Sequence, residues 1–378
     1  MLIQCTKILL EQLNLKPDLY EEEETLFSWH ANIITVNRKK VVVLVNDKNR
    51  YIVVLYGLKA KDFQRLDEHI IEAIRKTFQD EGIKDEIIEK FINSSKDIVY
   101  TKTSNRSMVA KMNKACENVY IYWRKSSNDS LYNSDTSIKA NRSLVSDGKD
   151  NYVYLNEEMY KDLQVFAKEP IFGCIAAVIK ITLDLEKNIV WRRIVVPANI
   201  TFDKLHKIIQ KAFGWMGYHL HQFYIYDASK KDLGINHSGY HKEGYMPILN
   251  LVSDKEDMDY DYNDVEKKLE KGIKLSECIP AKMKYNYDFG DNWQHYIEVE
   301  QILDDYDKNY PVCLEGEGNA PPEDVGGEYG YEEFIKIIEN ENHDEYDDMS
   351  AWGKAQGYEV FDIEKVNREI KSCGIRFY

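Results

Sequence analysis

The sequence predicts an α+β protein of two domains, and three observations support this prediction. The 378 residues exceed the usual size of a single domain. Hydrophobic residues make up 43% of the chain, which is enough for packed cores. Strand-like and helix-like segments are mixed, without the strict alternation of a parallel α/β sheet. We place the domains at residues 1–168 and 172–378, because Pro170 disfavours helix at the residue before it.

The first domain begins with three strand-like runs separated by turn residues, which predict an antiparallel meander. Apolar residues at helical spacing then predict two helices, followed by a strand, a helix containing Met108 and Met112, and a last strand. A run rich in Ser, Asn and Asp predicts a long mobile loop or an insertion before a closing helix. In order, these segments are 32–36, 41–45, 51–56, 62–78, 83–92, 97–101, a helix from about 108, 119–123, 125–151 and 154–166.

The second domain opens with a hairpin, a helix and a strand, an order that is typical of a β-grasp (ubiquitin-like) fold. Leu205, Ile208, Ile209 and Ala212 form one apolar face of this helix. An acidic, partly helical insertion, two strands around a Phe-Gly-Asp turn, and three terminal helices follow. The expected segments are 177–185, 189–196, 201–213, 220–226, 254–270, 283–287, 296–301, 331–340, 343–352 and 363–372.

The net charge of −15 is concentrated in one region of the chain. Residues 251–350 hold 29 Asp and Glu against 9 Lys and Arg, whereas the other residues carry a slight positive excess. A field of this sign repels phosphate and disfavours non-specific binding to nucleic acid. A basic protein partner or a divalent cation is compatible with it, and so is a solvated acidic face without a partner.

The cysteines and the N-terminus indicate a soluble cytoplasmic protein without a membrane partner. Six Cys stand apart, without a Cys-x-x-Cys pair, so neither a zinc ribbon nor a disulfide framework is expected. The first residues lack a signal-peptide pattern, and the apolar run 174–179 is too short to span a bilayer. Nucleotide-binding glycine loops, Gly-x-Ser-x-Gly and His-Glu-x-x-His are absent from the sequence.

Four short motifs combine aromatic, charged and glycine residues in a way that ordinary strands avoid. They are Val190–Arg193, Phe213–His221, Tyr287–His295 and Pro321–Gly327. In this order they resemble the plasmid pRiA4b ORF-3-like family, also described as a passenger-protein family of a bacterial insertion element, over about 175–367. The resemblance implies an α+β fold and a prokaryotic or mobile-element origin, and no established activity. The family often has Cys before Pro-Pro, where this chain has Ala320.

The first half is similar to a second uncharacterised bacterial domain, which is found fused to the first family. The residues that carry the likeness are Cys5–Lys7, Trp29–Asn32 and Thr103–Asn113. This resemblance implies no known chemistry.

His219 and His221 are candidate metal ligands, because residues two apart on a strand face the same side. Asp291, His295, Glu323 or Asp324 could supply a third ligand for a divalent metal. Alternatively, one histidine caps the backbone and the other is solvated. Asp288 also lies in the Tyr287–His295 motif, and with Tyr287 and Trp293 it is a candidate for ligand binding. Here the alternative is that the aspartates accept hydrogen bonds of the turn above a packed Trp293.

Glu323 and Asp324 are candidate general bases, because the Pro-Pro and Gly-Gly pairs around them can present both carboxylates to one site. They could equally anchor a surface loop. Arg192 and Arg193 point to opposite faces of a strand, so one could bind an anionic substrate. The alternative is an ion pair with an acidic residue.

We therefore weigh two functions. The favoured one is a binding or adaptor protein of mobile-element or defence context that engages a protein partner through an acidic surface rich in Tyr and Trp. The alternative is a metal-dependent hydrolase or nuclease-like enzyme, and its cofactor is unknown apart from the expected divalent metal. Recombination of DNA conflicts with the charge. The enzyme hypothesis uses His219, His221, Asp291 and His295 as ligands, Glu323 or Asp324 as base, and Arg192 or Arg193 for the substrate.

Overall fold

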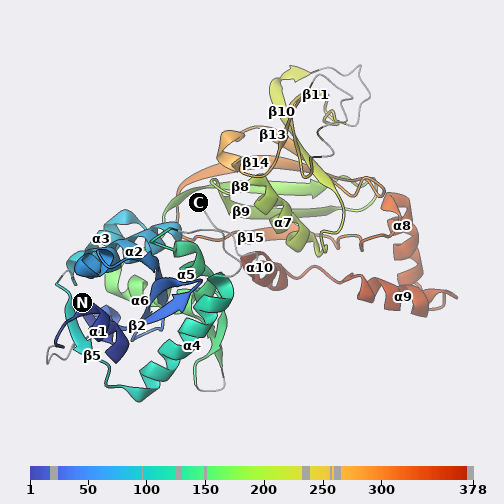
Figure 1. Cartoon of the computed structure of the whole chain (residues 1–378). Helices are drawn as coiled ribbons and strands as arrows, with labels where there is room; N and C mark the ends of the chain where they lie inside the picture. The colour runs from blue at the N-terminus through green and yellow to red at the C-terminus, as the bar shows by residue number, and fades with distance from the viewer. Residues whose placement is uncertain are drawn as a thin grey trace. The chain divides into compact units, whose positions relative to one another are not determined.

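The computed structural model of the chain describes residues 1–17, 24–95, 97–123, 130–148, 151–231, 239–255, 258 and 265–372. The chain divides into two compact units, Met1–Gly173 and Cys174–Tyr378. Each unit combines a sheet with helices around its own apolar core, so the predicted α+β class is confirmed (Figure 1). No helix in these described ranges has both the length and the apolar character that crossing a membrane requires.

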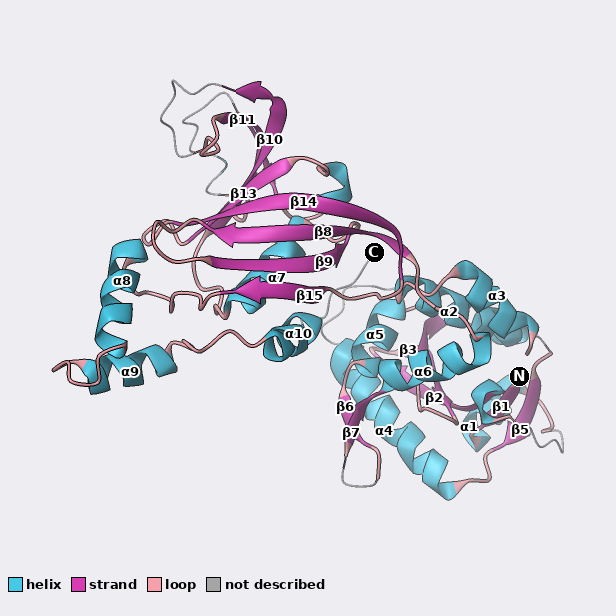
Figure 2. Cartoon of the chain, turned by 180° about the vertical axis from the view of Figure 1, so that it is seen from behind, coloured by secondary structure: helices cyan, strands magenta, loops and turns pink. Residues whose placement is uncertain are grey.

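The first unit contains a five-stranded sheet in the order β4-β3-β2-β1-β5. The predicted meander forms β2 to β4, and β1 adds to it in parallel with both β2 and β5. Figure 2 shows the strands and helices of this unit in separate colours. The strands are β1 (Leu2–Cys5), β2 (Ser28–Val36), β3 (Lys39–Asn46), β4 (Ile52–Leu58) and β5 (Val99–Lys102), with a small hairpin of β6 (Leu144–Ser146) and β7 (Tyr152–Tyr154).

Both faces of this sheet are buried, as its run of five consecutive apolar residues in β3 requires. Val42 and Leu44 pack into one core cluster, whereas Val41, Val43 and Val45 pack into another. Alternate residues of a strand point to opposite faces, so the run supplies both clusters. The covering helices are α1 (Lys7–Leu13), α2 (Leu66–Asp80), α3 (Asp85–Asn93), α4 (Arg106–Trp123), α5 (Ser134–Asn141) and α6 (Leu155–Ala167).

Two expectations for the first unit are wrong. Residues 119–123 belong to α4, because Val119 completes a buried helical stripe with Met108, Met112 and Cys116. Residues 130–148, expected in a long mobile loop or an insertion, contain α5 and β6. The polar residues of α5 cover the edge strand β4: the Asn141 amide pairs with the N–H (2.7 Å) and the carbonyl (2.8 Å) of Ile52. Residues 125–129 and 149–150 lie outside the described ranges.

The second unit contains an eight-stranded sheet in the order β12-β11-β10-β13-β14-β8-β9-β15. All neighbours are antiparallel except β11 and β12. The strands are β8 (Cys174–Leu183), β9 (Val190–Pro197), β10 (His221–Lys231), β11 (Tyr245–Val252), β12 (Glu266–Leu269), β13 (Lys282–Tyr287), β14 (Trp293–Tyr306) and β15 (Val312–Glu317).

The predicted opening of hairpin, helix and strand is present as β8, β9, α7 and β10. The buried stripe of α7 packs into the core on one face of the sheet. β14 and β13 lie between β8 and β10. Of the acidic insertion 254–270, expected to be partly helical, residues 256–257 and 259–264 lie outside the described ranges, and residues 266–269 form strand β12. The helices are α7 (Phe202–Phe213), α8 (Gly327–Ile338), α9 (Tyr346–Ala355) and α10 (Ile363–Ser372).

Candidate functional site

Three connecting segments of the second unit, 214–220, 288–292 and 321–327, are joined to one another by hydrogen bonds. The Asp288 N–H donates to the Leu220 carbonyl at 3.0 Å. The Met216 N–H donates to the Glu323 carboxylate at 2.9 Å, and the Gly326 N–H to the Asp291 carboxylate at 3.2 Å. These bonds bring three of the four sequence motifs together.

The turn between β13 and β14 positions the first carboxylate of this region. Asp288 has a φ of 55°, in the left-handed region that non-glycine residues seldom adopt. Its Oδ1 accepts the Gly290 N–H at 2.9 Å, and the Asp288 carbonyl accepts the Asn292 N–H at 2.6 Å. The other oxygen, Oδ2, therefore remains directed at His219, whose Nε2 lies 3.6 Å away.

A second carboxylate reaches the same imidazole from the 321–327 segment. Asp324 also has a positive φ, 59°, and its Oδ1 lies 3.1 Å from His219 Nε2. One ligand atom from each of His219, Asp288 and Asp324 lies within 4.8 Å of the others. Metal–ligand bonds of about 2.0–2.2 Å place neighbouring ligands about 3.0–3.5 Å apart, so the two measured separations are close to those around one ion.

The cluster is buried on one side and open on the other. The Asp288 side chain is 11% exposed and the His219 side chain 30%, whereas Asp324 is 57% exposed. Two carboxylates and an imidazole are hard to borderline ligands, which suit Mn²⁺, Zn²⁺ and related divalent ions. Three protein ligands would leave further coordination positions open to water or a substrate.

Three of the four expected metal ligands do not join this cluster. His221 is buried, with its Nε2 3.0 Å from the Glu270 carboxylate. His295 is fully buried against Phe213 and Trp215, and burial lowers its pKa to about 3. Asp291 accepts the Gly326 N–H. The two-residue periodicity does not apply to His219, because β10 begins only at His221.

Glu323, expected as a general base, acts as a structural anchor. It is 2% exposed, and its carboxylate accepts the Met216 N–H and the hydroxyl hydrogen of Tyr287. Burial, together with this contact, raises the pKa of Tyr287. Both Tyr287 and Trp293 lie in the core, where their rings stack near Trp215, so neither presents a ligand-binding surface. Asp324, the other expected general base, lies in the cluster, where its position suits a metal ligand.

Neither arginine is available for an anionic substrate. Arg192 is 2% exposed and donates to four backbone carbonyls, those of Ala212 (3.0 Å), Trp191 (2.8 Å), Glu317 (2.8 Å) and Gly318 (3.0 Å). Burial lowers its pKa to about 10. Arg193 pairs with Glu300 and Glu315 across the other face of the sheet, which is the ion-pair alternative that the sequence left open.

The sequence also contained no indication of a buried polar stack of two histidines in this unit. The imidazole rings of His206 on α7 and His221 are parallel, with centroids 3.6 Å apart. His206 Nδ1 lies 2.8 Å from the Tyr285 hydroxyl, and burial lowers the pKa of His206 to about 3. These partners come from separate elements without a shared motif, so no sequence pattern could have identified them.

A model of the plasmid pRiA4b ORF-3-like proteins matches residues 176–370, which is over half of the chain and contains every residue of the cluster. The chain belongs to the plasmid pRiA4b ORF-3-like family. The pRiA4b ORF-3-like region is preceded by a match, over residues 2–158, to a domain of unknown function, DUF6933. Both resemblances predicted from the sequence are thus confirmed.

Two proteins similar to the pRiA4b ORF-3-like region bear no assigned activity. The uncharacterized protein y4hQ of Sinorhizobium fredii is 31% identical over 202 residues, which are 53% of this chain and 92% of that protein. A crystal structure of a protein of unknown function from Methanosarcina mazei Go1 is 32% identical, with a TM-score of 0.40; the match covers 50% of this chain and 96% of that chain.

Proposed function

We propose that the second unit is a metal-dependent hydrolase whose divalent ion is held by His219, Asp288 and Asp324. The observation that carries the proposal is the convergence of these three donors, with His219 Nε2 3.1 Å from Asp324 and 3.6 Å from Asp288. Without a cation, two carboxylates would lie near one another beside a single imidazole. A divalent ion relieves this repulsion and matches the donor set.

The chemistry follows from the open side of the cluster. A divalent ion held by the three cluster residues would act as a Lewis acid and would supply an activated water molecule near neutral pH. The exposed Asp324 faces the side from which a substrate would arrive. The turn holds Asp288 rigidly. One carboxylate oxygen accepts the Gly290 N–H, and this hydrogen bond orients the other oxygen towards the cluster. Glu323 supports this arrangement by fastening Met216 and Tyr287.

Isothermal titration calorimetry of the metal-free full-length protein with Mn²⁺ or Zn²⁺ tests the proposal. We expect one site in the second unit, and Asp288→Asn and Asp324→Asn should each weaken binding by about tenfold to a hundredfold. Asp291→Asn is the matched control, because it lies in the same turn but outside the cluster and keeps an acceptor for Gly326. Equal weakening in all three variants, or no stoichiometric binding by the parent protein, would refute it.

Hydrolysis is tested separately with a panel of phosphate esters, carboxylic esters and peptides. Metal-loaded protein should turn over one class, and Asp324→Asn should remove that activity. If the protein binds the metal but hydrolyses none of these substrate classes, the cation site is supported and the hydrolase proposal is rejected.

Binding of a protein partner, in a mobile-element or defence context, is a second candidate with its own supporting observation. Large aromatic side chains close in sequence to the cluster residues face solvent: Tyr218 is 76% exposed, Phe289 46% and Tyr329 76%. Exposed aromatic residues are typical of protein interfaces, and the acidic excess of residues 251–350 favours a basic partner. A variant that carries both Tyr218→Ser and Tyr329→Ser should no longer bind a stoichiometric partner of the parent protein. The control is Tyr152→Ser, which replaces an exposed tyrosine of the first unit and should retain this binding.

A further inference from the structure

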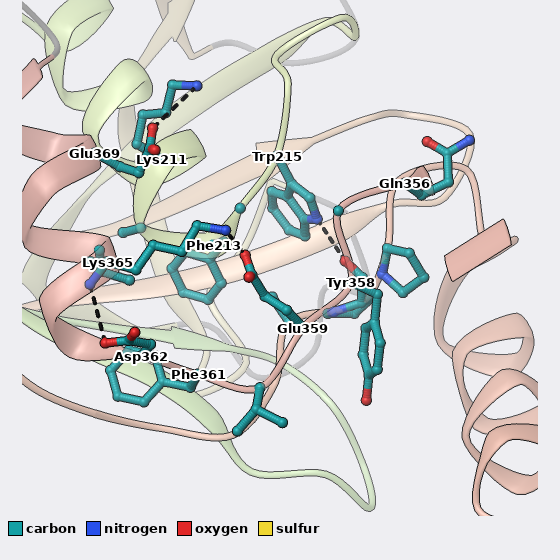
Figure 3. Close-up of a pocket in the computed structure, with 18 of the residues that line it drawn as sticks. Lys211, Phe213, Trp215, Gln356, Tyr358, Glu359, Phe361, Asp362, Lys365 and Glu369 are labelled. Carbon is teal, nitrogen blue, oxygen red and sulfur yellow. Dashed lines mark hydrogen bonds and ion pairs between the residues drawn. The ribbon is translucent and has the colours of Figure 1, made fainter. Parts of the chain in front are cut away.

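A pocket of about 220 Å³ lies in the second unit between the end of α7, the 320–322 segment and the chain from 356 to 369. Figure 3 shows its lining side chains. None of the three residues of the cation cluster lines it, so it differs in composition from that site. An apolar cavity of about 150 Å³ is large enough to hold benzene, whereas drug-sized ligands occupy sites of about 300–1,000 Å³. A molecule of one or two rings would therefore fill this pocket.

One part of the pocket wall is aromatic and preformed. Phe213 and Trp215 are buried, and Tyr358 and Phe361 are half-buried. The Trp215 indole N–H donates to the Pro321 carbonyl at 2.8 Å, which fixes the ring against a rigid Pro-Pro segment. Aromatic rings attract one another in stacked and edge-to-face arrangements. An aromatic ligand would therefore meet a surface that suits it and needs little rearrangement.

Arg192 also lines the pocket, but its N–H groups serve the backbone. Its guanidinium lies 4.0 Å from the Phe361 ring centroid and 5.1 Å from that of Phe213. Since its donors are directed to four backbone carbonyls, it holds the two rings in place and is not a ligand-binding group.

The charged side chains at the edge of the pocket already have partners. Lys211 on α7 pairs with Glu369 on α10. Lys365 pairs with Glu359, and Asp362 accepts two backbone N–H groups at the start of α10 (Figure 3). With Arg192 included, three basic and three acidic residues line the described part of the pocket, so their charges balance. A charged ligand would have to compete with one of these contacts, and a neutral ligand would not.

Two glycines lie close together in the pocket wall. A Cβ added to Gly357 would lie 3.6 Å from the Gly214 carbonyl oxygen, and one added to Gly214 would have no atom within 4 Å. Both residues have positive φ, 78° at Gly214 and 79° at Gly357, a conformation that strains other side chains. Gly214 directly follows α7, and carbonyl groups at the end of a helix attract a hydrogen-bond donor. The wall here thus offers an acceptor that no side chain covers.

We propose that this pocket binds a small, neutral, flat aromatic molecule with an N–H donor, of the chemical class of indole. Its ring would pack against Tyr358 and Phe361, and its N–H would donate to the Gly214 carbonyl. The aromatic wall, the paired charges and the uncovered acceptor each favour this class over an amino acid or an organic acid. The inference goes beyond the proposed hydrolase and does not depend on it.

Titration of the isotopically labelled full-length protein with indole, followed by NMR, tests the inference. For a ligand of about ten non-hydrogen atoms, the usual efficiency of small ligands predicts saturation with a Kd of about 0.1–1 mM. The backbone amide signals of Phe213, Gly214 and Gly357 should shift, whereas those of His219 and Asp288 should not. No saturation up to about 5 mM, or shifts confined to other residues, would overturn the inference.

Three related probes test the chemical class of the ligand. The compound 1-methylindole lacks the N–H donor, indole-3-acetate adds a carboxylate, and tryptamine adds an ammonium group. Each should bind about fivefold more weakly than indole, because it loses a hydrogen bond or brings a charge that has no partner. Equal or tighter binding of a charged probe would refute the neutral ligand, and equal binding of 1-methylindole would refute the hydrogen bond to Gly214.

A matched pair of variants locates the site. Ala320→Leu adds apolar volume inside the pocket and should weaken indole binding by about tenfold. Ala281→Leu is the control, because Ala281 is also a half-buried alanine that packs against the same core cluster, and it does not line the pocket. Circular dichroism checks that both variants fold, and the amide shifts of the parent protein locate the site if one does not. A loss of the same size in a folded Ala281→Leu variant would place binding elsewhere and reject the assignment.

Discussion

Replacing Arg192 by methionine should strongly destabilise the second unit. The substitution retains an apolar chain between Phe213 and Phe361, and it removes the guanidinium that donates to the carbonyls of Trp191, Ala212, Glu317 and Gly318. These carbonyls belong to β9, the end of α7, the last residue of β15 and the residue that follows it. The four carbonyl oxygens would then have lost this donor in a buried region, since Arg192 itself is 2% exposed.

The magnitude follows from the number of acceptors left without a donor. An unsatisfied buried acceptor costs about 1–3 kcal/mol, and water can reach some of these four once the guanidinium is gone. We expect a loss of about 3–5 kcal/mol in the free energy of unfolding, comparable to breaking a buried ionic network. For a unit of this size the loss corresponds to a drop of about 10 °C in Tm.

Arg193→Met is the matched control on the same strand. Arg193 faces the other side of the sheet, and its partners Glu300 and Glu315 are about a third and more than half exposed. Exposed ion pairs contribute about 0–1 kcal/mol, so the control should lose less than about 1 kcal/mol. Urea unfolding of the full chain, with hydrogen exchange of β9 and β15 to locate the change, measures both. If Arg192→Met loses no more than Arg193→Met, the four-carbonyl argument is wrong.

Two further predictions concern stability. Burial lowers the pKa of His295 to about 3. Between about pH 6.5 and pH 3, the unfolded state therefore binds a proton at this residue that the folded state does not bind. The contribution of His295 to the free energy of unfolding should fall by about 1.4 kcal/mol for each unit by which the pH is lowered through this window. Urea unfolding at several pH values should show this slope reduced by that amount in His295→Phe; an unchanged slope would contradict it. In the first unit, Asn141→Ala leaves the N–H and carbonyl of Ile52 without their partner, and it should lower the free energy of unfolding by about 2 kcal/mol. The control is Lys139→Ala, which removes an ion pair with Asp135 within α5 and should cost less than about 1 kcal/mol. Equal losses in these two variants, measured by thermal unfolding, would show that α5 does not protect β4.

The sequence by itself determined the elements whose residues repeat with a clear period. The meander of the first unit and the amphipathic α7 were predicted because strand and helix periods appear directly in the order of apolar residues. Where polar residues serve a neighbouring element, the same approach failed: the Asn and Ser side chains of α5 bond to the edge of β4, and their composition alone indicates a loop.

Only the tertiary structure decided which polar side chains meet. The motifs named the correct segments, and His219, Asp288 and Asp324 were all candidates, but grouping His219 with His221 relied on a strand that begins after His219. Arg192 and Glu323 carry the charges expected of a site and instead hold the backbone together from buried positions. The reason is physical: which donors share a site depends on where three loops converge and on how the backbone is satisfied, and these contacts join residues far apart in the chain.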